Sequence, residues 1–337
     1  MPHLLEVEGL TTVFDSDYGR TVSVDHVNFH VDKGEVVCIV GESGCGKSVT
    51  SLSIMGLLGR GGTVTEGSVV FEDKNLLTMT EKELDKIRGD RLTMIFQDPL
   101  TSLDPVFTVG NQLMESIRKH MRLSKEEARK RAEQILGKVG MPDPCAVMKK
   151  YPHTLSGGMR QRVMIAMALC CNPGLLIADE PTTALDVTIQ AQILDLLRMI
   201  QQELDTATIL VSHDLGVVAR VADRVAIMYA GKIVEIGTAK EIFYDPRHPY
   251  TWGLMQSLPG FSRGQNRLHT IPGMPPSLVH LPKGDAFAAR NEYALGIDYE
   301  QEPPMFQITK THYAATWLLD KRAPKIECPI KRGRNDE

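Results

Sequence analysis

Short hydrophobic runs separated by glycine and polar residues recur along the chain and predict a mostly parallel β-sheet. The run Val36–Val40 (VVCIV) is apolar throughout and is bounded by glycines, which is typical of a strand buried on both faces. Three further runs of this kind lie at Leu175–Ala178, Thr208–Ser212 and Val225–Tyr229. A helical segment, Ile189–Leu204, separates the first two of these three. The order strand, helix, strand indicates βαβ connections and an α/β fold.

Two other parts of the chain have different patterns. Before the buried run, the spacing of apolar residues predicts strands at Leu4–Val7 and Ser23–Val31, and a third strand is expected at Gly67–Phe71. The stretch from about residue 98 to 171 is expected to be mostly helical. Two capping boxes, each a Ser or Thr followed three residues later by Glu, predict helix starts at Thr80–Glu83 and Ser124–Glu127.

The composition changes near Asp245, because eleven of the 19 prolines fall between Pro246 and Pro329. Proline fixes φ and lacks the backbone N–H that helices and sheets need. The C-terminal part is therefore predicted to be a separate, loop-rich appendage.

Composition and charge exclude several classes of protein. The net charge of −4 disfavours a strongly basic nucleic-acid-binding protein. The longest uncharged apolar run, Val163–Cys171, is far short of the roughly 20 residues that span a bilayer. The first residues lack the basic and apolar regions of a secretory signal. Six cysteines in 337 residues do not suggest a disulfide framework, which favours a reduced cytosolic compartment.

The segment Gly41–Ser48 (GESGCGKS) has the spacing of a phosphate-binding loop, between a predicted strand and a predicted helix. Glycines let backbone N–H groups wrap a phosphate, and the positive end of the following helix faces the same anion. Lys47 would reach the β- and γ-phosphates, and Ser48 would offer its hydroxyl to Mg²⁺. The residues expected to bind nucleotide here are Gly41, Glu42, Ser43, Gly44, Cys45, Gly46, Lys47, Ser48 and Val49.

The thiol of Cys45, inside this loop, has two possible orientations. Beside the helix N-terminus and Lys47, an accessible thiol would have a pKa below that of a free thiol and would be reactive. Alternatively, Cys45 is a small residue that fills the turn, with its thiol pointed into the sheet.

Two carboxylates, Asp179 and Glu180, directly follow the run Leu175–Ala178. Asp179 would orient Mg²⁺, and Glu180 would polarise the attacking water as general base. His213 follows another predicted strand. Because ligands bind at the carboxyl ends of parallel strands, it would lie near the γ-phosphate.

A second anion-binding helix start is predicted at LSGGM, which comprises Leu155, Ser156, Gly157, Gly158 and Met159. Ser156 would cap the helix, and the two glycines permit close backbone approach. This segment has no role in a one-chain phosphate site. It indicates a head-to-tail dimer in which each chain closes the other chain's nucleotide; the alternative is an ordinary Ser-Gly-Gly helix start.

In this order, the motifs resemble those of the ABC-type ATPases. GESGCGKS resembles the family's Walker A motif, LLIADE at residues 175–180 its Walker B motif, and LSGGM its signature. Gln97 resembles the Q-loop residue that contacts Mg²⁺ or the attacking water, and His213 resembles the switch histidine. Tyr18 resembles the aromatic residue that stacks on adenine, with Phe14 as the competing choice. The D-loop corresponds to Thr183, Ala184, Leu185 and Asp186.

The resemblance implies a P-loop NTPase fold in which residues 1–240 form an ABC cassette. Such a cassette has a mixed or parallel sheet core, an N-terminal antiparallel β subdomain and an α-helical subdomain, here at about residues 98–172. Residues 241–337 would form a Pro-rich C-terminal extension. The implied ligands are ATP and Mg²⁺, and the implied activity is ATP hydrolysis.

The segment Asp245–Pro259 resembles the region after the cassette in oligopeptide and dipeptide importers, as do IPGMPPSL and GDAFAAR further on. Many of these relatives carry four cysteines there and bind an iron–sulfur cluster. Because such clusters need thiolate ligands, none is expected in this chain. The matching positions are Asp285, Asn291, Asp298 and Thr316.

The resemblance implies a subunit that powers import of oligopeptides or dipeptides by ATP-driven dimer closure. Its implied partners are a second, non-identical ABC ATPase subunit, two transmembrane permease subunits and an extracytoplasmic peptide-binding protein, with no nucleic acid. The implied location is the cytoplasmic face of the plasma membrane. The alternatives are nickel or saccharide import and a soluble ABC ATPase without a transport role. Because Glu180 and His213 are both present, a module that binds ATP without hydrolysis is disfavoured.

Overall fold

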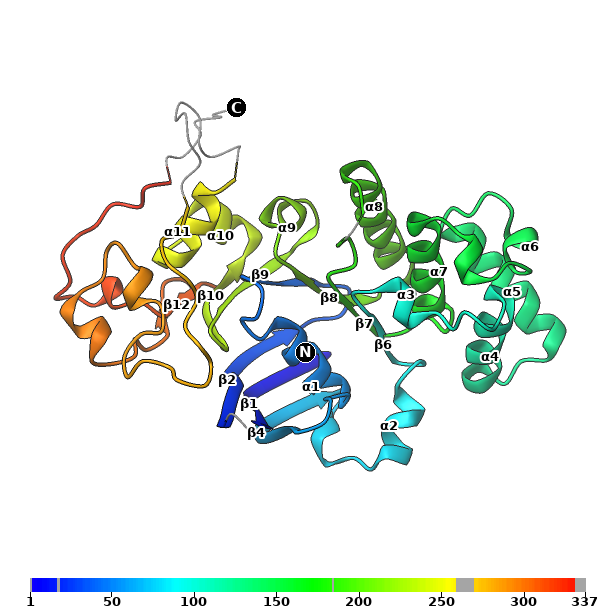
Figure 1. Ribbon diagram of the computed structural model, residues 1–337, viewed down its shortest axis with the longest axis horizontal. Coiled ribbons are helices and arrows are strands. Elements are labelled where there is room, and N and C mark those ends of the chain that lie inside the picture. The colour runs from blue at the N-terminus through cyan, green and yellow to red at the C-terminus, as the bar shows by residue number, and fades with distance from the viewer. Residues whose placement is uncertain (1, 17–18, 184, 259–269, 331–337) are drawn as a thin grey trace.

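The computed structural model describes residues 2–16, 19–183, 185–258 and 270–330. Its elements form two sheets, a helical group beside one edge of the larger sheet, and a C-terminal extension at the opposite edge (Figure 1). Among the described residues, no helix is both long enough and apolar enough to cross a bilayer.

The larger sheet has the strand order β11-β12-β10-β9-β3-β8-β7-β6. Its five strands from β9 to β6 are parallel, and β10, β12 and β11 add antiparallel pairs at one edge. Every residue of β3, β7 and β8 is buried, which confirms the expected doubly covered strands. The strands are β3 (Val36–Val40), β6 (Leu92–Ile95), β7 (Leu175–Asp179), β8 (Ala207–Ser212), β9 (Arg224–Tyr229), β10 (Lys232–Thr238), β11 (Phe306–Gln307) and β12 (Tyr313–Ala314).

The smaller sheet is antiparallel and contains the three strands expected near the N-terminus. It has the order β2-β1-β4-β5. Its first strands are longer than predicted because bulges let the pairing of β1 with β2 and β4 continue past Val7. The four strands are β1 (Leu5–Ser16), β2 (Gly19–Val31), β4 (Gly62–Phe71) and β5 (Lys74–Asn75).

The helices are concentrated in the middle of the chain, as predicted. Both capping boxes are present, at the starts of α2 and α5. Helices α3 to α7 form the group beside β6 (Figure 1). The helices are α1 (Lys47–Met55), α2 (Glu81–Ile87), α3 (Pro99–Ser102), α4 (Val109–Met121), α5 (Lys125–Lys138), α6 (Pro144–Val147), α7 (Gly157–Leu169), α8 (Val187–Leu204), α9 (Leu215–Val221), α10 (Ala239–Tyr244) and α11 (Pro249–Gln256).

The C-terminal extension is rich in loops, as predicted, but it is not separate from the sheet. Strand β12 pairs with β10, so that Ala314 lies opposite Glu235 and covers the edge that β10 would otherwise expose. Glu235 itself is fully buried and accepts a hydrogen bond from His312 Nε2 at 2.8 Å. The described part of the extension also holds the 3₁₀ turns η3 (Ala288–Arg290), η4 (Gly296–Tyr299) and η5 (Trp317–Leu319).

Four buried polar side chains occupy the positions that match the cysteines of cluster-binding relatives. Each accepts a hydrogen bond from a backbone N–H two or three residues away and so stabilises a local turn. The turns are ordered in addition by aromatic packing, in which Phe287 lies against both Tyr229 and Tyr250. The four residues are Asp285, Asn291, Asp298 and Thr316. The absence of a cluster stays a prediction.

Burial of Asp285 makes the extension sensitive to pH. Burial raises the pKa of this carboxyl from 3.8 to about 6, while the N–H of Phe287 lowers it. Because its pKa is higher in the folded protein, the folded state binds the proton more tightly than the unfolded state does. The free energy of unfolding therefore falls as the pH rises from about 4 to about 6. Asp285→Asn keeps an oxygen acceptor and removes the charge. Its gain in unfolding free energy should be about 1 to 2 kcal/mol larger at pH 8 than at pH 5.

Thermal or urea unfolding at the two pH values measures this difference, and Asp320→Asn is the matched control. The pKa of Asp320 is lowered to about 2 by its hydrogen bond to Arg322, so this carboxyl is ionised at both pH values. Asp320→Asn should therefore change stability equally at pH 5 and pH 8. An equal effect of Asp285→Asn at the two pH values would contradict the prediction.

Candidate functional site

The loop between β3 and α1 requires glycine at two points, one because of its backbone conformation and both because neighbouring backbone lies close. Gly46 is the N-cap of α1 with φ of 108°, and a side chain there would clash with the carbonyl oxygen of Ser23. A side chain at Gly41 would clash with the carbonyl oxygen of Met228. The glycines therefore let the loop lie directly against β2 and β9, with the N-terminus of α1 facing the cavity.

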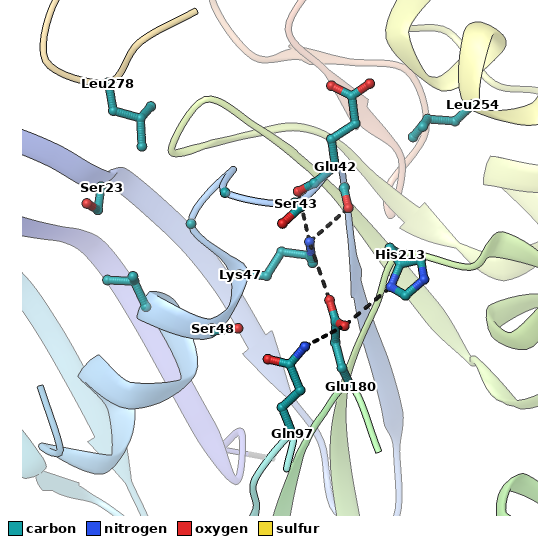
Figure 2. Close-up of a pocket in the computed structure, with 14 residues that line it drawn as sticks. Ser23, Glu42, Ser43, Lys47, Ser48, Gln97, Glu180, His213, Leu254 and Leu278 are labelled. Carbon is teal, nitrogen blue, oxygen red and sulfur yellow. Dashed lines mark hydrogen bonds and ion pairs between the residues drawn. The ribbon is translucent and has the colours of Figure 1, made fainter. Parts of the chain in front are cut away.

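This loop lines a cavity of about 560 Å³ together with residues from distant parts of the chain. The structure brings Gln97, Glu180 and His213 to the same cavity as the loop, as predicted (Figure 2). Three lining residues were not predicted. They are Ser23 of β2, Leu254 of α11 and Leu278 of the extension.

Lys47 is held inside the loop. Its Nζ donates hydrogen bonds to the carbonyl oxygens of Gly41 at 2.8 Å and Glu42 at 2.9 Å. The same nitrogen lies 4.0 Å from Glu180 Oε1, and the side chain is only 4% exposed. The buried ammonium of Lys47 thus lies between the loop and the acidic end of β7, where the negative charge of a phosphate would be stabilised.

Glu180 follows β7 in a strained conformation, with φ of 45°. A non-glycine residue in the left-handed region is uncommon, and such strain is often found at active sites. The carboxylate accepts hydrogen bonds from Gln97 Nε2 at 3.1 Å and from Thr183 Oγ1 at 2.8 Å. His213 Nδ1 lies 3.4 Å from Oε2. The role of Thr183 was not predicted, because the D-loop resemblance gave no contact for its hydroxyl.

Asp179 and Ser48 form the pair expected for Mg²⁺. The Ser48 hydroxyl donates to Asp179 Oδ1 at 3.0 Å. Burial raises the pKa of Asp179, while the hydrogen bond from Ser48 lowers it. A hydroxyl, a carboxylate and the Gln97 amide oxygen are hard oxygen donors of the kind that Mg²⁺ prefers, and a divalent cation would stabilise the ionised form of Asp179. The residues present therefore fit this ion.

Cys45 takes the second of its two possible orientations, and the alternative of a reactive thiol is wrong. The residue is 6% exposed and belongs to a core cluster with Ile39 and Met228. Burial raises the pKa of its thiol, and the nearby charge of Lys47 only opposes this shift. The desolvation of a thiolate therefore outweighs the attraction of the helix terminus and the lysine.

Of the six cysteines, Cys145 is the one with an exposed side chain. A small maleimide should therefore modify Cys145 first and should leave Cys45 unmodified with or without MgATP. The hydrogen bond to Glu133 raises the pKa of Cys145, so the labelling rate should rise from pH 7 to pH 9. Peptide mapping after timed labelling measures this order. Cys145→Ser should abolish the fast phase, and fast labelling of Cys45 would refute the assignment.

The signature segment lies away from the chain's own cavity. Ser156 accepts a hydrogen bond from the Met159 N–H at 3.4 Å and caps α7, as predicted. Ser156 and Gly157 are exposed, and none of residues 155–159 is among those that line the cavity. Asp186 of the D-loop caps α8 through the Ile189 N–H at 2.9 Å. Ala184 lies outside the described residues.

Of the two candidates for the residue that stacks on adenine, the structure describes Phe14. Tyr18, the first choice, lies outside the described residues. The ring of Phe14 lies against Gly62, and Phe14 is not among the residues that line the cavity.

Comparisons with known proteins identify the family. Residues 24–183 match the model described as ABC transporter, and residues 234–297 match the one described as oligopeptide/dipeptide transporter, C-terminal region. The chain is similar to the oligopeptide transport ATP-binding protein OppD of Bacillus subtilis, with 57% identity over 97% of this chain and 92% of the relative. It is also similar to the dipeptide transport ATP-binding protein DppD of Lactococcus lactis, with 52% identity over 96% of this chain and 93% of the relative.

A solved structure supports the same assignment. It is the dimeric, post-hydrolysis state of an ATP-binding cassette bound to ADP and Pi, with a TM-score of 0.63 and 30% identity over 70% of this chain and 98% of that one. The predicted P-loop cassette fold, with its antiparallel N-terminal sheet, is confirmed. The chain belongs to the ATP-binding subunits of ABC transporters, in the group with the oligopeptide/dipeptide transporter C-terminal region.

Proposed function

We propose that this chain hydrolyses ATP to power the import of oligopeptides or dipeptides across the plasma membrane. The observation that carries the proposal is the combination, in one chain, of a cavity lined by Lys47, Gln97, Glu180 and His213 with the C-terminal region of oligopeptide/dipeptide transporters. The relatives named above are oligopeptide and dipeptide transport proteins, which favours peptides over nickel or saccharides as cargo. Their names equally favour a transport subunit over a soluble ABC ATPase.

The geometry of the site supports a division of roles among its residues. Backbone N–H groups of the loop and Lys47 would bind the phosphates of ATP, while Ser48 and Asp179 would hold Mg²⁺, which supplies charge stabilisation at the β- and γ-phosphates. Glu180 would accept a proton from the attacking water. The hydrogen bond from Gln97 and the nearby His213 orient this carboxylate.

We infer that the site is completed by a second cassette. The signature segment, in which Ser156 and Gly157 are exposed, does not line the chain's own cavity, and the similar cassette of known structure is dimeric. The proposed partner is a non-identical ABC ATPase subunit, and the remaining partners are two transmembrane permease subunits and an extracytoplasmic peptide-binding protein. The chain would then lie at the cytoplasmic face of the plasma membrane as a peripheral subunit.

Reconstitution of the complete transporter in vesicles tests the proposal. With the peptide-binding protein present, ATP should drive accumulation of a labelled oligopeptide or dipeptide, and unlabelled peptides should compete. Accumulation of nickel or a saccharide in place of peptides would refute the proposed cargo. Quantitative mass spectrometry of the same complex measures its composition, and a transport-active complex with two copies of this chain as its only ATPase would refute the non-identical partner.

A further inference from the structure

The C-terminal extension contacts the phosphate loop at Glu42. In Figure 2 the Glu42 carboxylate points away from Lys47 and Glu180. It is bound there by the guanidinium of Arg290, with Nη1 to Oε2 at 2.6 Å and Nη2 to Oε1 at 2.9 Å. This is a two-point ion pair across 248 positions of sequence. Paired parallel hydrogen bonds of this kind fix orientation as well as charge.

Arg290 is itself held firmly. Its side chain is 5% exposed, its Nε donates to the carbonyl oxygen of Pro272 at 2.8 Å, and its Nη1 lies 3.3 Å from the Tyr229 hydroxyl. The hydrogen bonds to Glu42 raise the pKa of Arg290 above its already high value. The guanidinium of Arg290 is thus a charge in a fixed position. The extension supplies it, and Tyr229 of β9 in the cassette contacts it.

A second contact from beyond the cassette holds the same residue by its backbone. The Glu42 N–H donates to the hydroxyl of Tyr250 at 2.9 Å, and Tyr250, in α11, is fully buried. The Glu42 carbonyl oxygen is one of the two acceptors that hold Lys47. Glu42 therefore links the cation that would bind phosphate to two side chains that follow the cassette in sequence.

The charge of Glu42 explains why such a contact matters. A carboxylate in the loop repels a triphosphate, and it also competes for Lys47. Arg290 neutralises this carboxylate and holds it away from Lys47. We propose that the C-terminal extension sets the nucleotide affinity of the phosphate loop through Arg290, which acts as a positioning residue on Glu42. This inference rests on the proposed function only in that ATP binds at the loop; it does not depend on the cargo.

Coupling of this kind works in both directions. If the pairing of Arg290 with Glu42 favours ATP binding, bound MgATP must stabilise that pairing to the same degree. Any ligand or partner that moves the turn η3 would thereby change the affinity of the site for ATP. The extension would then act as a regulator of the cassette.

A double-mutant cycle on the full-length chain tests the proposal. The dissociation constant of a fluorescent ATP analogue with Mg²⁺ is measured for the unaltered chain, Arg290→Met, Glu42→Gln and the double variant. Arg290→Met should weaken binding roughly 5- to 100-fold. The same change in the Glu42→Gln background should weaken it less than about twofold, because no carboxylate is left to neutralise. Arg290→Lys keeps the positive charge but cannot make both parallel hydrogen bonds to the Glu42 carboxylate. Its loss of affinity should therefore be intermediate.

Turnover in the assembled ATPase pair gives a second measurement. Arg290→Met should raise the KM for ATP by a factor similar to its effect on binding, with kcat changed less than about twofold. A merely structural role would lower the unfolding temperature and weaken binding equally with and without the Glu42→Gln substitution, and that outcome would overturn the proposal. If Arg290→Met does not fold, the cycle is run with Arg290→Lys. Failure of the unaltered chain to bind MgATP would instead refute the proposed function.

Discussion

Replacing Glu180 with Gln should reduce ATP hydrolysis by about 10²- to 10⁴-fold, the contribution of a positioned general base. Gln has the same size and keeps an oxygen that can accept from Gln97 and Thr183, so the strained backbone and its contacts should persist. The amide does not take a proton from water. MgATP binding should be retained. The nucleotide-bound dimer should accumulate because the hydrolysis step that would let it dissociate is blocked.

Phosphate release measures the loss, nucleotide titration measures binding, and size-exclusion chromatography with MgATP measures the dimer. Glu72→Gln is a matched control, since Glu72 pairs with Arg91 and is not among the residues that line the cavity; its turnover should be normal. Turnover of Glu180→Gln within a few fold of the unaltered protein would remove Glu180 from the role of base.

Local patterns were sufficient to predict the buried parallel strands β3, β7, β8 and β9, but they missed β6 and β10. Strand β10 contains Glu235, which breaks its apolar pattern although the residue is fully buried. The carboxylate is tolerated because the N–H groups of Arg247 and His248 and the ring of His312 donate to it. A buried charge is stable only with such partners, and these partners lie 12 to 77 positions away.

The site likewise has features that the local sequence determines and features that depend on residues far away in the chain. The loop, Glu180 and His213 could be predicted because each follows a strand that the sequence predicts, and Gln97 could be predicted from its resemblance to the Q-loop residue. The contact of Arg290 with Glu42 could not, because it depends on how the extension folds back over 248 positions. The orientation of Cys45 was undetermined for another reason. Lys47, two residues further along the chain, favours a thiolate, and the burial of Cys45 in the core, which the local sequence does not show, is the main cause that raises its pKa.

Replacing Lys47 with Ala should weaken binding of MgATP roughly 10- to 150-fold, the range for hydrogen bonds to a charged group. The substitution removes an ammonium that lies 4.0 Å from Glu180 Oε1 and leaves the Gly41 and Glu42 carbonyl oxygens without their donor. A triphosphate would then meet uncompensated acceptors where it now meets an ammonium. Lys47→Arg should recover only part of the affinity, because a planar guanidinium does not fit the two carbonyl oxygens that hold a compact ammonium.

Lys47→Ala and Glu180→Gln should differ in how they respond to the concentration of ATP. The lysine acts when the phosphates bind, so part of the turnover lost in Lys47→Ala should return as MgATP is raised far above its normal KM. The carboxylate acts in the chemical step, so turnover of Glu180→Gln should stay low at every concentration. Turnover measured from micromolar to millimolar MgATP separates the two. If saturating MgATP restored neither variant, Lys47 would act mainly in the chemical step, through the charge that it places beside Glu180.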